Sequence, residues 1–155
     1  MNNENLKPWM HGLLKFAGGY NIIAGLSMIL FYHEGFKALG IPKPEVNLPI
    51  QLVGLMVFLF GIGYLMVDRK PSENRNVLLL GMLSKLLGPM LAIGYVVGGK
   101  LPWMMIPVLF FADFVYLLPF WMIYRTIGSR TQMQDKTQDI ESIPMPTGNQ
   151  RKRAA

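Results

Sequence analysis

The sequence predicts an all-α integral membrane protein, a four-helix bundle with short loops and a disordered C-terminal tail. Hydrophobic residues make up 52% of the 155 residues and charged residues only 15%, whereas roughly 25% of the residues in soluble domains are charged. The apolar residues come in four blocks of about 20, the length that a helix needs to cross the hydrocarbon core of a bilayer. We therefore predict a transmembrane domain over residues 1–127 and a disordered cytoplasmic tail over residues 128–155.

The four predicted spans are separated by short stretches rich in charge, proline and glycine. Backbone groups in lipid have to form hydrogen bonds within their own segment, so these apolar runs are expected to be helices. The runs are too long and too uniformly apolar for the alternating strands of a membrane barrel. The spans cover residues 10–32, 49–67, 77–97 and 101–124.

The connections between the spans differ in length. The first, residues 33–48, is predicted to form one or two interfacial helical turns that end at Gly40, either as a surface connector or as a lid that gates a ligand. The second, residues 68–75, is a short polar hairpin. The third, residues 98–103, is tight, so the last two helices should be antiparallel neighbours with Pro102 in the first turn of the last helix.

Lysine and arginine predict the orientation. The side that holds both termini and the middle connection carries ten of these residues, and the opposite side carries three. The positive-inside rule then places both termini in the cytoplasm. The net charge of +6 is therefore a topology signal. Nucleic acid is not an expected partner, because no basic groove with interleaved aromatic residues is present in the sequence.

The residue inventory excludes several kinds of chemistry. The chain contains no cysteine, which rules out structural disulfides, thiol redox chemistry and thiolate ligands for iron or zinc. Its two histidines, His11 and His33, are too far apart to suggest a metal site. No metal is therefore predicted, and no catalytic residue is assigned.

Two opposite charges lie inside the apolar spans, Lys85 in the third and Asp113 in the fourth. Such a group costs roughly 2.5–3.5 kcal/mol to insert, so it is usually paired or functional. At 1.5 Å per residue both lie about 12 Å from the cytoplasmic face, which predicts an ion pair between adjacent helices. Asn21 and Lys15 of the first span fall in the same half of the membrane. Tyr116, one turn after Asp113, could bond the carboxylate or flank a ligand.

Small residues indicate that these polar groups face protein rather than lipid, because such residues permit close helix contact. Lys85 lies on a stripe with Gly81, Gly88 and Ala92, Asn21 lies between Ala17 and Gly25, and Gly54 and Gly61 form a seam on the second helix.

Two roles stay open for the polar cluster. It is either a structural bridge that locks two helices, or a small site for an amphipathic ligand or a proton. In the second case Asp113 would titrate or bond a head group, while Lys85 would keep its charge or bind an anionic oxygen. Pro89 and Pro119 each free a helix carbonyl nearby, although prolines are common in membrane helices.

Several short motifs resemble those of a group of small bacterial four-helix membrane proteins of uncharacterised function, and the general plan is similar to that of DoxX-like proteins. The resemblance covers residues 10–125 and implies a protein of the bacterial cytoplasmic (inner) membrane that engages a quinone or a respiratory or redox partner protein. A homo-oligomer is also left open. The motifs are Ser84-Lys-Leu-Leu-Gly-Pro89, Gly99-Lys-Leu-Pro-Trp103, Asp113 and Leu118-Pro-Phe120.

Three function classes follow. The leading one is an accessory or binding protein that engages a quinone or lipid near Lys85 and Asp113. The alternative is a small proton-coupled transporter that uses Asp113. It resembles small multidrug resistance proteins in having four short helices, but the first span carries Lys15 and Asn21 where those proteins carry a glutamate. A lipid- or sterol-modifying enzyme ranks last, because acid–base catalysis needs two positioned titratable groups and the spans hold no second acid.

Overall fold

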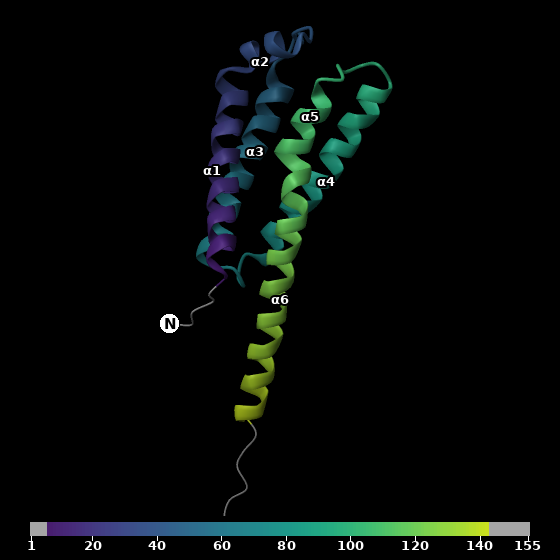
Figure 1. Cartoon of the computed structure of the whole chain (residues 1–155). Coiled ribbons are helices and arrows are strands. Elements are labelled where there is room, and N and C mark those ends of the chain that lie inside the picture. The colour runs from purple at the N-terminus through teal and green to yellow at the C-terminus, as the bar shows by residue number, and fades with distance from the viewer. Residues whose placement is uncertain (1–5, 143–155) are drawn as a thin grey trace, which may run out of the picture.

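The computed structural model describes residues 6–142, in which all regular elements are helical (Figure 1). Side chains are described except at residues 130–135 and 138–142. The first three spans are single helices, and the fourth is built from two α-helices with a π-helix between them. The elements are α1 (Pro8–Leu30), α2 (Tyr32–Leu39), α3 (Leu48–Arg69), α4 (Arg75–Val97), α5 (Met105–Leu109), the π-helix η1 (Phe110–Phe114) and α6 (Val115–Ser142).

Four segments are long and apolar enough to cross a membrane, so the chain is a multi-pass membrane protein of the predicted all-α class. They are Pro8–Leu30, Leu48–Arg69, Arg75–Val97 and Met105–Ser129. The first three agree with the predicted spans to within two residues. The predicted helical turns in the first connection are also confirmed: α2 ends at Gly40, which adopts the left-handed conformation with φ 64°.

The fourth span begins later than predicted. The amide groups of Lys100 and Leu101 both donate to the carbonyl of Tyr95 and close the end of α4. Pro102 lies in the following turn, where its own carbonyl accepts a hydrogen bond from the amide of Met105. Pro102 is therefore a turn residue before α5, and its predicted place in the first turn of the helix was wrong.

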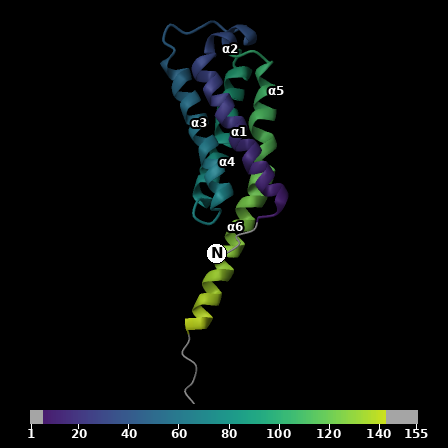
Figure 2. The same cartoon turned by 90° about the vertical axis from the view of Figure 1, so that its left-hand side faces the viewer.

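The boundary of the predicted tail was also wrong. Helix α6 continues to Ser142, so residues 128–142 are helical, and Figures 1 and 2 show this helix extending well beyond the others. The sequence between Gly128 and Pro144 contains no proline or further glycine to stop a helix. Polarity alone had suggested a tail here. The rest of the predicted tail, residues 143–155, lies outside the described part of the chain.

Helices α1 and α3 form a closely packed antiparallel pair. A methyl group added at Gly25 would lie 2.5 Å from the carbonyl oxygen of Gly54, and one added at Gly61 would lie 2.7 Å from that of Gly18. Two pairs of glycines, each a heptad apart, thus bring the two backbones into contact. This confirms the predicted seam on α3 and adds Gly18 to the residues predicted on α1.

Helices α4 and α6 form the second pair, and an apolar core joins the two pairs at the end of the molecule that carries the α3–α4 connection. Tyr64 of α3 packs its ring against Gly81 of α4 and lies edge-on to Phe120 of α6, with ring centroids 4.9 Å apart. Toward the end that carries α2, the two pairs lean apart (Figure 1). The best-buried residues of this core are Leu14, Ala17, Tyr64, Val67, Leu78, Phe120, Ile123 and Ile127.

Candidate ligand site

The predicted ion pair between α4 and the fourth span is present. Lys85 Nζ lies 2.9 Å from Asp113 Oδ1. Lys85 is ten residues from the start of α4 and twelve from its end, so the pair lies near the middle of the span. The two partners differ in burial: 7% of the Lys85 side chain is exposed, and 25% of the Asp113 side chain. The cation is enclosed, whereas the carboxylate can be reached.

Asp113 lies in the π-helix η1, a feature that sequence reasoning missed. A π-turn forms hydrogen bonds five residues apart and is often found at functional sites. Lys85 Nζ donates a second hydrogen bond, of 2.9 Å, to the main-chain carbonyl of Ala112 in the same turn. One ammonium group therefore bonds both a side-chain and a backbone oxygen of η1. The only sequence signal for this arrangement is Lys85 itself, a cation in an apolar span that needs acceptors.

Two tyrosines lie beside the pair. Lys85 Nζ is 5.0 Å from the ring centroid of Tyr116, within the range of a cation–π interaction. The ring of Tyr116 also stacks on that of Tyr20 of α1, with centroids 6.4 Å apart. Tyr116 is buried, whereas Tyr20 is 41% exposed. The aromatic pair thus connects α1 to α6 next to the charges.

Asn21 and Lys15 take no part in the two hydrogen bonds that Lys85 donates to Asp113 and Ala112. Asn21 is buried on α1 together with Ala17 and Gly25, as its stripe predicted. Lys15 is largely exposed, and its Nζ lies 3.9 Å from Asp68 Oδ2 of α3. Asp68 also accepts a 2.6 Å hydrogen bond from His11 Nδ1.

These three residues form a second polar cluster, at the end where α1 starts and α3 finishes. It was not predicted, because Asp68 was assigned to the connection while α3 continues to Arg69.

The stripe of α4 that carries Lys85 also differs from the prediction. Gly81, Lys85 and Pro89 are buried, whereas Gly88 is exposed and a methyl group added to it would meet no atom within 4 Å. The buried face follows spacings of four residues in this part of the helix. Gly88 therefore faces the surroundings of the protein and not the polar cluster.

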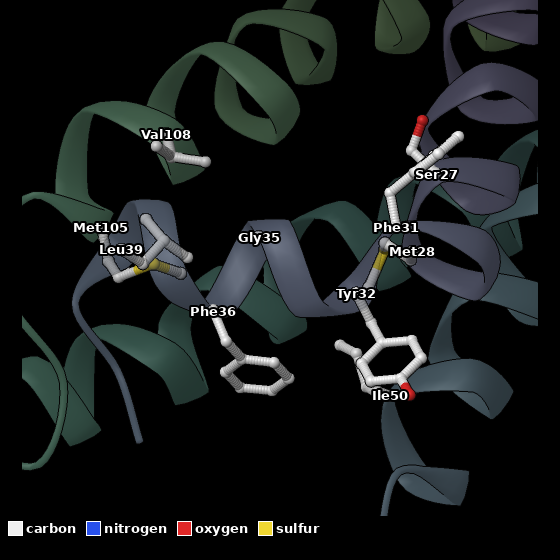
Figure 3. A pocket seen from close by; sticks show the side chains of 10 residues that line it. All are labelled: Ser27, Met28, Phe31, Tyr32, Gly35, Phe36, Leu39, Ile50, Met105 and Val108. Atoms are coloured by element: carbon white, nitrogen blue, oxygen red, sulfur yellow. The ribbon is translucent and has the colours of Figure 1, made fainter. Parts of the chain in front are cut away.

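An apolar cavity of about 370 Å³ lies between the helix pairs at the α2 end. Helix α2 lines it with Tyr32, Phe36 and Leu39, which recur at helical spacing, and α5 contributes Met105 and Val108 (Figure 3). The lining residues are Ser27, Met28, Phe31, Tyr32, Gly35, Phe36, Leu39, Ile50, Met105 and Val108.

The cavity and Asp113 share the fourth span, whereas the cavity lining contains no residue of α4, the helix of Lys85. Val108 precedes Asp113 by five residues, and Ser27 follows Tyr20 by seven. At 1.5 Å per residue these separations are about 8 and 10 Å along the helix axes. Asp113 and Tyr20 therefore lie one to two turns from the cavity along their helices, toward the middle of the membrane span.

Comparison with protein-family models, with curated proteins and with solved structures finds no match to this chain. The DoxX-like resemblance therefore stays a prediction. In the described part of the chain, no group of three or more histidine or acidic side chains comes together as a metal site would require.

Proposed function

We propose that this chain is a membrane-integral binding protein that holds a quinone or a lipid beside Lys85 and Asp113. The observation that supports this most directly is the asymmetry of the pair. Among the described residues, the ammonium of Lys85 is the one hydrogen-bond donor to the carboxylate, and it bonds Oδ1. Oδ2 belongs to a side chain that is a quarter exposed, so it can accept a bond from a ligand.

A purely structural bridge has less support. Neutral polar contacts between membrane helices contribute about 0.6 kcal/mol on average, so two helices can be joined without charges, each of which costs roughly 2.5–3.5 kcal/mol to insert. An ion pair that serves only to join two helices would be stronger if both side chains were buried, because a low dielectric strengthens the attraction between the two charges. The partly exposed carboxylate of Asp113 and the nearby cavity are instead what a ligand-binding site would require.

The orientation proposed for this site follows from charge. Arg69, Lys70, Arg75 and Arg125 all lie near the end that carries the α3–α4 connection. We propose that this end faces the cytoplasm of a bacterial cell, across its inner membrane. The cavity would then lie in the outer half of the membrane.

Native mass spectrometry of the protein released from lipid nanodiscs tests the proposal. The wild-type protein should retain a small-molecule adduct, and the same spectrum gives its oligomeric state. Asp113→Asn should lose the adduct. Glu73→Gln is a matched control, because it also removes one acidic charge, from an exposed pair with Lys70 in the connection. A bare wild-type chain, or an adduct kept by Asp113→Asn, would contradict the proposal.

The π-turn supports a proton-coupled transporter as the second candidate. The wider turn of η1 interrupts the regular helix of the fourth span at Asp113, and Pro89 in the third span and Pro119 in the fourth each remove one backbone hydrogen bond near the charged pair. Irregular helix backbone also occurs at the binding sites of transporters. Vesicles that contain the protein and a pH-sensitive dye would then show proton movement that Asp113→Asn abolishes. Equal movement in both proteins would remove this candidate.

A further inference from the structure

We infer that the ligand of this site is a neutral amphiphile whose head group donates a hydroxyl hydrogen bond to Asp113, and whose hydrocarbon chain fills the cavity under α2. The inference rests on the proposed binding function and names its ligand class. Two kinds of molecule belong to this ligand class: a reduced quinol, and a hydroxyl-bearing lipid such as a fatty alcohol or diacylglycerol.

The ammonium group of Lys85 is fully occupied by groups of the protein. An ammonium group has three N–H donors. Lys85 uses one for Asp113 Oδ1 and one for the carbonyl of Ala112, each at 2.9 Å, and its remaining side faces the ring of Tyr116. Only 7% of its side chain is exposed. Lys85 is therefore already saturated and enclosed, and it cannot hold an anionic head group.

The carboxylate of Asp113 can take a further hydrogen-bond donor. An ionised carboxylate only accepts hydrogen bonds. Oδ1 of Asp113 is bonded to Lys85, so Oδ2, on a side chain that is a quarter exposed, is the oxygen left for a ligand. An anionic head would meet this negative oxygen without a free cation to offset it. A head group with acceptors only, such as an oxidised quinone, would leave the oxygen without a donor. A hydroxyl group satisfies the oxygen and adds no charge.

The cavity under α2 offers an apolar surface for the hydrocarbon chain. Of the two hydroxyl groups in the cavity lining, that of Tyr32 already accepts a 3.3 Å hydrogen bond from Asn47 Nδ2. The rest of the lining is aliphatic, aromatic or thioether surface, or glycine. The cavity begins about 8 Å from Asp113 along the fourth span. Such a surface suits a hydrocarbon chain that continues outward from a head group at Asp113.

Matched probes test the head group. Dodecanol, dodecyl methyl ether and dodecanoate share one chain length and differ in whether the head donates, only accepts or is charged. Each is added to the protein in detergent micelles at the same mole fraction, and the thermal unfolding midpoint is recorded. We expect dodecanol to raise the midpoint and to bind at least tenfold more tightly than the ether, since hydrogen bonds to charged groups have this strength. Equal shifts with dodecanoate or the ether would overturn the inference.

Two glycine variants test the chain site. Gly35 lines the cavity, and a methyl group added there meets no atom within 4 Å. Gly35→Leu should therefore fill the cavity without disturbing the fold and abolish the dodecanol shift. Gly12→Leu is the control, because Gly12 is equally open but lies outside the cavity, and it should keep the shift. Suppose instead that Gly35→Leu has the wild-type midpoint without probe and still shows the dodecanol shift. The hydrocarbon chain would then lie elsewhere, and the assignment of the cavity would be overturned.

The failures of the two proposals are distinguishable. If native mass spectrometry finds no adduct on the wild-type protein and no probe shifts its midpoint, the binding function itself is wrong. If an adduct is present but proves to be anionic or to lack a donor, only the ligand class is wrong. An adduct with the mass of a quinol or of a neutral hydroxyl lipid would support the inference and tell the two sources apart.

Discussion

Replacing Asp113 by asparagine keeps the shape of the side chain and removes one charge of the buried pair. Lys85 Nζ would then keep the carbonyl of Ala112, 2.9 Å away, and an amide oxygen, but it would have no counter-charge. Breaking a buried ion pair costs about 3–5 kcal/mol, because the remaining charge is left without compensation. Since a quarter of the Asp113 side chain is exposed, we expect a loss near the lower limit, about 3 kcal/mol.

The partner substitution, Lys85→Met, leaves a different defect. Methionine fills a similar volume, but the carbonyl of Ala112 loses its donor and Asp113 keeps an unpaired charge that water or a head group can partly reach. An unsatisfied buried acceptor costs about 1–3 kcal/mol, so we expect a loss of about 2 kcal/mol. In the double variant no charge remains to be stranded, and the total loss should be about 2 kcal/mol and not the 5 that independent effects would give.

The free energy of unfolding of the four proteins, measured by denaturant titration in bicelles at one lipid composition, gives this coupling. A coupling of about 3 kcal/mol is expected. If the double variant loses the sum of the two single losses to within about 0.5 kcal/mol, the two groups act independently and the ion-pair reasoning is refuted. A double variant that regains stability but retains no adduct would separate the structural role of the pair from its role in binding.

Two further predictions concern packing and orientation. Gly61→Ala should lower the free energy of unfolding by about 1–3 kcal/mol, because its methyl group would press on the backbone of Gly18 and overpacking has costs of this size. Gly19→Ala, at an open position of α1, should be neutral or stabilising, and an equal loss in both variants would refute close contact of the helices. Because the chain lacks cysteine, an impermeant thiol reagent added outside intact cells should label Lys43→Cys and spare Glu73→Cys, and the reverse pattern would invert the proposed orientation.

Much of the fold could be predicted from the sequence, because the bilayer restricts the choice of structure so strongly. Four apolar blocks separated by polar turns leave few arrangements other than four helices. The ion pair could be predicted for a related reason: a lone charge in the span is too costly, and the tight turn at Gly98 to Trp103 makes its helix and that of the opposite charge neighbours. The glycine seam on α3 followed from its heptad spacing.

The other features of the fold and the site depend on details of the backbone that cannot be read from the spacing of residues. The π-turn at Asp113 has no sequence signature, and it decides which groups surround the charge. The burial of Pro89 in place of Gly88 follows from how α4 is turned against its neighbours. Lys15 was assigned to the central cluster because depth was counted from the sequence. A long side chain and an α3 that continues to Arg69 place it beside Asp68 instead.

The π-turn has a consequence for the way the fourth span tolerates insertions and deletions. A π-turn adds one residue to a helix, and one residue corresponds to a rotation of about 100°. The wider turn of η1 takes up this extra residue, so Met105 to Leu109 face as they would in a regular helix one residue shorter. Deleting a single residue of η1 should therefore close the turn to an α-helix and leave Val108 and Met105 at the cavity. Deleting a residue from the regular turns of α6 that follow should instead rotate them by about 100° away from it. The length and hydrophobicity of the span would be almost the same in both cases, so hydropathy could not tell the two deletions apart.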